Sequence, residues 1–140
     1  MAVAEYLVDE SALARLDQPV VFARLAPLVE AGLVATCAVI ELEILYSTQR
    51  HADYEAVRVD RREGYEWLPM ADEVWDRALD VQRQLSAQGQ LRAVGIPDLL
   101  IAATAERHAV TLVHYDSDFD VVAAVTGQPT EWVVPRGSVP

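Results

Sequence analysis

Short apolar runs that alternate with helical patterns are the feature of this sequence that most restricts its fold. Helical patterns cover 19–33, 38–48, 53–66, 72–89 and 96–108. Each is bordered by a run that predicts a strand, at 3–8, 33–36, 67–70, 110–114 and, as a last edge strand, 131–134. Strands that alternate with helices are typical of an α/β protein with a mostly parallel sheet. With 140 residues, 52% of them hydrophobic, we expect one domain over residues 1–140.

Breaks in these helical patterns lead to three local expectations. Pro27 should kink or split the helical segment 19–33, because proline removes a backbone donor and crowds the preceding turn. Gly89 should end the fourth long helix, and residues 84–95 form the plausible flexible loop. The segment from Ile96 is apolar nearly all round, which predicts a helix buried on both sides.

Five carboxylates fall where such a sheet forms its sites. Asp9 follows the first strand, Asp116 and Asp118 follow the fourth, Asp98 opens the buried helix, and Glu43 lies inside an apolar helix. Sites in open parallel sheets form at the carboxyl ends of strands, so these acids are expected at one edge. Taken one at a time, Asp9 and Asp98 also suit helix caps, and the acids after the fourth strand also suit a solvated loop.

The convergence of these carboxylates predicts a metal site. Carboxylates that meet in one pocket repel each other, and a hard divalent cation relieves that repulsion. Oxygen ligands suit Mg²⁺ or Mn²⁺ better than zinc. Glu41 competes with Glu43, but residues two apart on a helix face different sides, so we expect one of the two to be solvated.

Other acid-rich or nucleotide-binding motifs do not fit. The segment from Asp116 to Asp120 resembles the start of a calcium-binding loop, but its sixth position is Val121 and its twelfth is Gly127, where that loop needs Gly and Glu. The sequence contains no GxxxxGK[ST], GxGxxG or GxSxG motif. A phosphorylated receiver domain needs a lysine near its site, and this chain has none.

The charge distribution limits how a nucleic acid is held. The formal net charge is −11 and all eleven basic residues are arginine, which excludes a generic polyanion-binding surface. Contact with RNA would depend on a few arginines, with Arg50 and Arg92 the best candidates and Arg15 and the Arg58/Arg61/Arg62 group, on a helix expected to be solvated, as further ones. The alternative for each is an ordinary surface ion pair.

Cysteine usage and the termini predict a cytoplasmic location. Cys37, the single cysteine, has no partner for an internal disulfide, as is usual in a reducing compartment. The first ten residues lack the basic start and long apolar stretch of a signal peptide, and no segment approaches the ~18 apolar residues of a membrane span.

Four segments together resemble a PIN domain, specifically a toxin ribonuclease of the VapC type from bacterial toxin–antitoxin pairs. They are LVDESAL around Asp9, IELEILYS around Glu43, IPDLLIAATAERH with Asp98, and LVHYDSDFDVV with Asp116 and Asp118. They occur in the family's order and span nearly the whole chain. The chain departs from the family pattern at Ser47, where glycine is common, and at His114-Tyr115, which replaces a hydroxyl-bearing residue.

The resemblance implies a three-layer α/β/α sandwich and assigns roles to matching residues. The implied metal ligands are Asp9, Asp98, Asp116 and Asp118, Glu43 completes the catalytic set, and Ser11 supports the first acid. The implied activity is metal-dependent hydrolysis of RNA phosphodiester bonds with Mg²⁺, Mn²⁺ substituting. The implied partners are a cognate VapB-type antitoxin and a second copy of the chain. The alternatives are a noncatalytic PIN-like binding module and a housekeeping nuclease.

Overall fold

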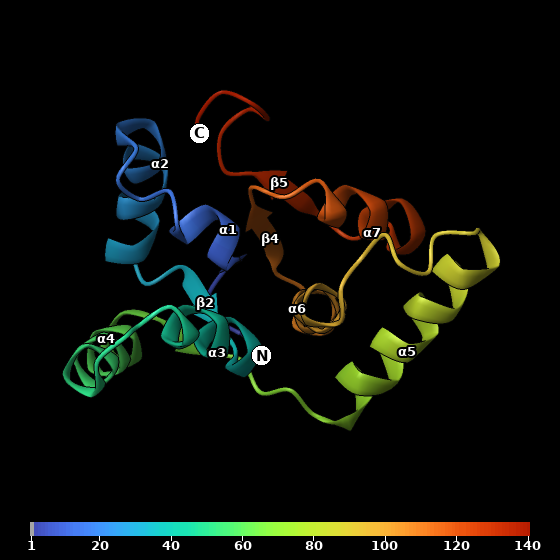
Figure 1. The fold of residues 1–140 in the computed structure, drawn as a ribbon, viewed down its shortest axis with the longest axis horizontal. Helices are drawn as coiled ribbons and strands as arrows, with labels where there is room; N and C mark the ends of the chain where they lie inside the picture. The colour runs from blue at the N-terminus through green and yellow to red at the C-terminus, as the bar shows by residue number, and fades with distance from the viewer. Residues whose placement is uncertain (1) are drawn as a thin grey trace.

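Five short strands form one sheet in the computed structural model, which describes residues 2–140 (Figure 1). In chain order they are β1 (Tyr6–Val8), β2 (Val34–Thr36), β3 (Glu66–Trp67), β4 (Thr111–His114) and β5 (Thr130–Trp132). Their order across the sheet is β3-β2-β1-β4-β5, and every pairing is parallel. The predicted α/β class is confirmed, and the sheet is parallel throughout.

Helices cover both faces of this sheet. They are α1 (Glu10–Leu13), α2 (Pro19–Glu30), α3 (Ala38–Tyr46), α4 (His51–Gly64), α5 (Asp72–Ala87), α6 (Ile96–Arg107) and α7 (Asp118–Thr126). Because side chains alternate along a strand, Val8 and Val113 pack with α1 and α2, while Leu7 and Leu112 pack with α3, α5, α6 and α7. Figure 1 shows α1 and α2 on one side of the strands and α3 and α6 on the other. The three-layer α/β/α architecture is thereby confirmed.

The apolar helix α6 is buried along most of its length, as its sequence predicts. Residues 99–105 are all buried, because the sheet lies on one side of α6 and α5 and α7 pack on others. Its first turn emerges at the carboxyl edge of the sheet, which brings Asp98 to that edge. Among residues 2–140, no helix combines the length and apolarity needed to cross a membrane.

Three local expectations are corrected. Helix α2 continues through Pro27 without a break, because Pro27 lies on the exposed side, where water reaches the freed carbonyl. Helix α5 extends to Ala87, so the following loop is shorter than 84–95, although Gly89 ends the helix as predicted, with a left-handed φ of +73°. Strand β3 stops at Trp67, and Pro69 has no backbone donor to extend the pairing.

Candidate active site

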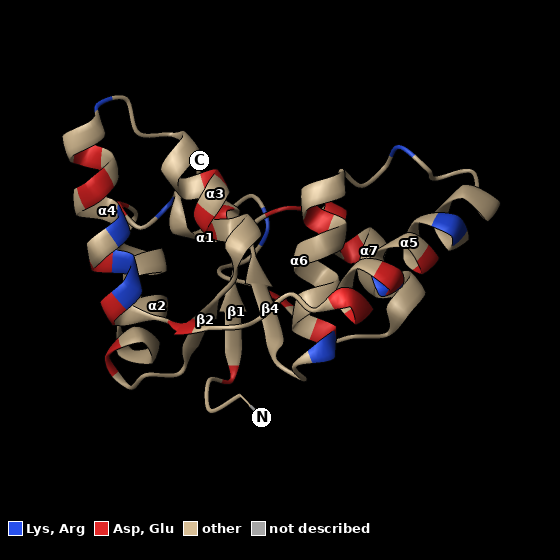
Figure 2. Cartoon of the chain, turned by 90° about the horizontal axis from the view of Figure 1, so that it is seen from below, with Lys and Arg blue, Asp and Glu red and all other residues tan. Residues whose placement is uncertain are grey.

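The predicted acids gather at the carboxyl edge of the sheet. Asp9 follows β1, and Asp116 and Asp118 follow β4, which pairs directly with β1. Asp98 joins them from the first turn of α6 and Glu43 from α3. Figure 2 shows acidic segments of α1, α3 and α6 at the same end of the central strands.

Three of these carboxylates form a tight group. Asp98, Asp116 and Asp118 each offer one oxygen, and these oxygens lie within 4.8 Å of one another. At that separation each pair of charges repels by about 1 kcal/mol in water and about 3 kcal/mol at an effective dielectric constant near 20. Burial, together with the charges of Asp9 and Asp116, raises the pKa of Asp98 to about 7. Burial and the charge of Asp116 also raise the pKa of Asp118.

Asp9 and Glu43 add two buried oxygens that lack hydrogen-bond partners. Asp9 is 4% exposed, and its Oδ2 accepts the Ser11 N–H at 3.0 Å while its Oδ1 is unpartnered within residues 2–140. Glu43 Oε1 is in the same situation. Burial raises the pKa of Asp9, and burial followed by the charges of Asp9 and Glu10 raises the pKa of Glu43 to about 7. Buried carboxylate oxygens of this kind require a cation or a proton.

Helix starts hold three of the acids in place. Asp9 caps α1, Asp98 is the third residue of α6, and Asp118 is the first residue of α7. The positive end of a helix stabilises a nearby carboxylate by about 0.3–1 kcal/mol, which offsets only part of the mutual repulsion. Asp116 is fixed differently, because its Oδ1 accepts the Asp118 N–H at 2.9 Å. Local capping therefore positions the acids but leaves most of their charge uncompensated.

Ser11 and His114 brace the main chain beneath the acids. The Ser11 N–H bonds to Asp9, while its Oγ accepts the Tyr115 N–H at 2.9 Å and so ties the end of β1 to the end of β4. His114 is fully buried between Phe119 and Trp132, and its Nδ1 accepts the Asp116 N–H at 3.1 Å. Its Nε2 is buried without a hydrogen-bond partner within residues 2–140.

The two glutamates of α3 are both at least partly buried, which corrects the expectation that one is solvated. Glu41 is paired with Arg61 at 2.8 Å, with both side chains 11% exposed, and it also accepts a hydrogen bond from the Thr36 hydroxyl. Arg61 is therefore not a solvated residue of α4. Because Glu41 and Glu43 face opposite sides of the helix, Glu43 alone turns toward the acids.

The arginines predicted to hold RNA do not meet the acids. Arg50 forms an exposed ion pair with Asp53 at 3.0 Å, as the alternative expectation stated. Arg92 is exposed in the loop before α6 and has no ion pair in the part of the chain described. None of the ion pairs found within residues 2–140 involves the five predicted acids.

One acid near the site was missed by the sequence reasoning. Glu10 is partly buried, its pKa is raised by burial and by the charge of Asp9, and its own charge acts on Glu43. Its position directly after Asp9, in the first turn of α1, was the available signal. The structure thus assembles a strongly acidic, all-oxygen site, a donor set that suits a hard divalent cation.

Comparisons with known proteins agree with this geometry. The family model for the PIN domain matches residues 6–125. The chain is 44% identical over 133 residues to Ribonuclease VapC21 of Mycobacterium tuberculosis, covering 95% of this chain and 96% of that one. It is 42% identical over 135 residues to Ribonuclease VapC51 of the same species, covering 96% and 97%.

Solved structures share the fold at low sequence identity. A DNA-bound VapBC complex from Salmonella typhimurium aligns with a TM-score of 0.77 at 14% identity, covering 94% of this chain and 100% of that chain. VapBC-5 from Mycobacterium tuberculosis aligns with a TM-score of 0.61 at 25% identity, covering 91% and 98%. On the family model and the close relatives, the chain belongs to the PIN-domain family and, within it, to the VapC ribonucleases.

Proposed function

We propose that this protein is a metal-dependent endoribonuclease and the toxin of a type II toxin–antitoxin pair. The observation that carries the proposal is the group of carboxylate oxygens from Asp98, Asp116 and Asp118 within 4.8 Å, joined by unpartnered buried oxygens of Asp9 and Glu43. This set of oxygens fits Mg²⁺, with Mn²⁺ substituting. Close relatives of the chain are named ribonucleases. The complete acid set argues against a noncatalytic PIN-like module.

In the proposed mechanism the acids have two roles, metal binding and proton transfer. Asp9, Asp98, Asp116 and Asp118 would hold a divalent cation, and that cation would supply a lowered pKa for bound water and stabilisation of charge on the phosphate. Glu43 projects from α3 toward these acids and has a buried oxygen without a hydrogen-bond partner among residues 2–140, so it is placed to accept a proton from the attacking water. The water oxygen bonds to phosphorus, the bond to the leaving oxygen breaks, and the proton passes on to that oxygen.

Cleavage of RNA by the purified protein tests the proposal. Mapping of new 5′ ends should show cuts in the presence of Mg²⁺ or Mn²⁺ and none in EDTA. Asp98→Asn should remove the activity, while Asp60→Asn, an exposed acid on α4, should retain it. If the metal-loaded wild type cuts no RNA, the noncatalytic binding module becomes the better account.

This protein has a groove beside the acids that suits the proposed antitoxin. A groove of about 590 Å³ is lined mainly by apolar side chains and reaches Glu10 and Glu43; the apolar lining is Val39, Leu42, Tyr46, Trp75, Ile96, Pro97 and Leu100. It suits a peptide with apolar anchors and an arginine or lysine directed at the acids. Several solved neighbours are VapBC complexes, including VapBC2 from Rickettsia felis.

Expression in cells tests the toxin assignment. The wild type should arrest growth, and co-expression with the small adjacent gene should restore growth through a stable complex. Asp98→Asn should lose toxicity and still bind that partner. Harmless expression of an RNA-cleaving wild type, with no binding to the neighbouring product, would favour a housekeeping nuclease.

We also propose that residues 1–140 act as one domain, in the cytoplasm with their RNA substrate, and that the chain forms a homodimer. Exposed apolar side chains on α3 and α5, including Leu42, Tyr46, Trp75 and Leu79, support self-association. Light scattering should give twice the 15.5 kDa mass of the chain. A monomeric mass across micromolar concentrations would contradict this part of the proposal.

A further inference from the structure

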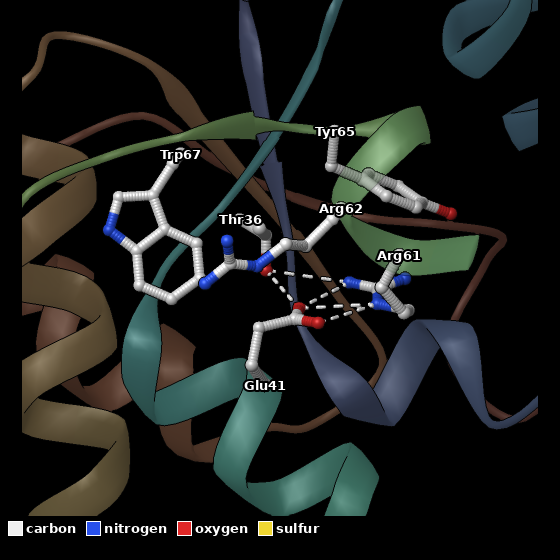
Figure 3. A pocket seen from close by; sticks show the side chains of 6 residues that line it. All are labelled: Thr36, Glu41, Arg61, Arg62, Tyr65 and Trp67. Carbon is white, nitrogen blue, oxygen red and sulfur yellow. Dashed lines mark hydrogen bonds and ion pairs between the residues drawn. The ribbon is translucent and has the colours of Figure 1, made fainter. Parts of the chain in front are cut away.

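A second pocket lies at the carboxyl edge of the sheet, at the ends of β2 and β3 and on the side of α3 that carries Glu41. It has a volume of about 370 Å³ and is lined by Thr36, Glu41, Arg61, Arg62, Tyr65 and Trp67 (Figure 3). Thr36 ends β2 and pairs in register with Trp67, which ends β3. Since neighbouring strands are about 4.8 Å apart, β3 lies roughly 10 Å from β1, whose end carries Asp9.

One wall of this pocket is formed by the Arg61–Glu41 ion pair, whose opposite charges compensate each other. The Arg61 guanidinium donates to both Glu41 oxygens, from Nη2 at 2.8 Å and from Nε at 3.1 and 3.2 Å, and lies 3.9 Å from the centre of the Tyr65 ring. The Thr36 hydroxyl also donates to Glu41. Figure 3 shows this network opposite Trp67. Because Arg61 compensates Glu41, that carboxylate does not by itself make the pocket repel an anion.

The opposite side presents one cation without an ion pair in the described part of the chain and one half-exposed aromatic side chain. Arg62 is exposed and, within residues 2–140, forms neither a hydrogen bond nor an ion pair. By contrast, its neighbours Arg58 and Arg61 are both paired with glutamates. Trp67 is 50% exposed although it lies at the end of a sheet strand. Figure 3 shows Arg62 between the Trp67 indole and the Arg61–Tyr65 wall.

We propose that this pocket binds one nucleotide of the RNA strand at a position beyond the cleaved bond, with the base stacked on Trp67 and a phosphate on Arg62. The inference rests on the proposed ribonuclease function. A strand lying on the acidic site needs a cation nearby, because the chain carries a net charge of −11. An arginine next to an open aromatic face is how proteins hold single-stranded nucleic acid without sequence readout.

The proposal is tested by binding of a short fluorescein-labelled 2′-O-methyl oligoribonucleotide, which resists cleavage, measured by anisotropy in Mg²⁺. Trp67→Leu should raise Kd at least about fivefold through lost stacking, and Trp67→Phe, which keeps a ring, should stay within about twofold of the wild type. Arg62→Gln should raise Kd about three- to tenfold and reduce the salt dependence by roughly one phosphate contact.

Matched controls separate a local from a general effect. Phe22→Leu removes an aromatic side chain that is 58% exposed on α2, and Arg107→Gln removes an exposed arginine at the last turn of α6, away from the Asp98 end. Both should bind the probe like the wild type. With cleavable RNA, the Trp67 and Arg62 variants should raise KM and leave kcat within about twofold.

Two results would overturn the pocket assignment: unchanged Kd in Trp67→Leu and Arg62→Gln, or equal losses in the two controls. Unchanged RNA affinity combined with loss of the antitoxin complex would assign the pocket to a protein partner instead, because Arg62 and Trp67 also border an apolar pocket with Leu42 and Leu45. If the wild type cuts no RNA, the proposed function fails. The noncleavable probe still decides the pocket separately.

Discussion

Replacing Asp98 with asparagine should stabilise the metal-free protein while abolishing its activity. The pKa of Asp98 is raised from 3.8 to about 7. Keeping the Asp98 carboxylate ionised in the folded protein at pH 8 therefore costs at most about 4 kcal/mol of unfolding free energy. Partial exposure and solvent screening reduce that figure, and the lost interaction with the start of α6 removes about 0.3–1 kcal/mol. We therefore expect a net gain of about 1–2 kcal/mol in unfolding free energy.

Thermal melts in EDTA provide the measurement. A gain of this size should raise Tm by about 2–8 °C at pH 8. The folded-state pKa lies above the unfolded value of 3.8, so the cost is absent below about pH 3, where both states are protonated, and develops as the pH rises to about 7. The difference between Asp98→Asn and the wild type should therefore vanish near about pH 3. Added Mn²⁺ should stabilise the wild type more than the variant.

A lower Tm for Asp98→Asn in EDTA at pH 8 would refute this reasoning. It would identify Asp98 as a helix-start residue whose stabilising effect exceeds the repulsion from its neighbours. Equal stabilisation of both proteins by Mn²⁺ would show that Asp98 does not bind the metal. Asp60→Asn on the exposed side of α4 controls for the general effect of removing one negative charge from an acidic chain.

Three further outcomes follow from the same contacts. Glu43→Gln should abolish RNA cleavage, whereas Glu41→Gln should keep most of it. In urea unfolding, Glu41→Gln should lower the unfolding free energy by about 3 kcal/mol, because Arg61 then loses its buried partner. Equal loss of activity in both variants would contradict the assignment of Glu43. The metal-free wild type should lose stability as the pH rises from about 4 to 7, because the pKa values of Asp98 and Glu43 are both raised to about 7 in the folded state. A Tm that increases as the pH rises over this range would count against the acidic cluster. Ser11→Ala should lower the unfolding free energy by about 1–2 kcal/mol and weaken Mn²⁺ binding measured by calorimetry, because the Tyr115 N–H loses its acceptor. Unchanged values would show that Ser11 does not support the site.

Local sequence patterns determined the fold class and the position of the acids. The alternation of strand and helix patterns specifies a parallel sheet, and in such a sheet residues that directly follow adjacent strands share one edge. This is why the sequence predicts that Asp9, Asp116 and Asp118 lie together, as they do in the structure. Asp98 was predictable in the same way, because an apolar helix that opens with an acid brings that acid to the edge.

Contacts between distant elements were decided only by the tertiary structure. Helical periodicity shows that Glu41 and Glu43 face opposite sides, but it does not show that Arg61, twenty residues later, neutralises Glu41. The burial of His114 likewise depends on Phe119 and Trp132, which pack around it. Periodicity specifies the direction of a side chain relative to its own helix or strand, whereas its partner depends on how separate elements pack across the sheet.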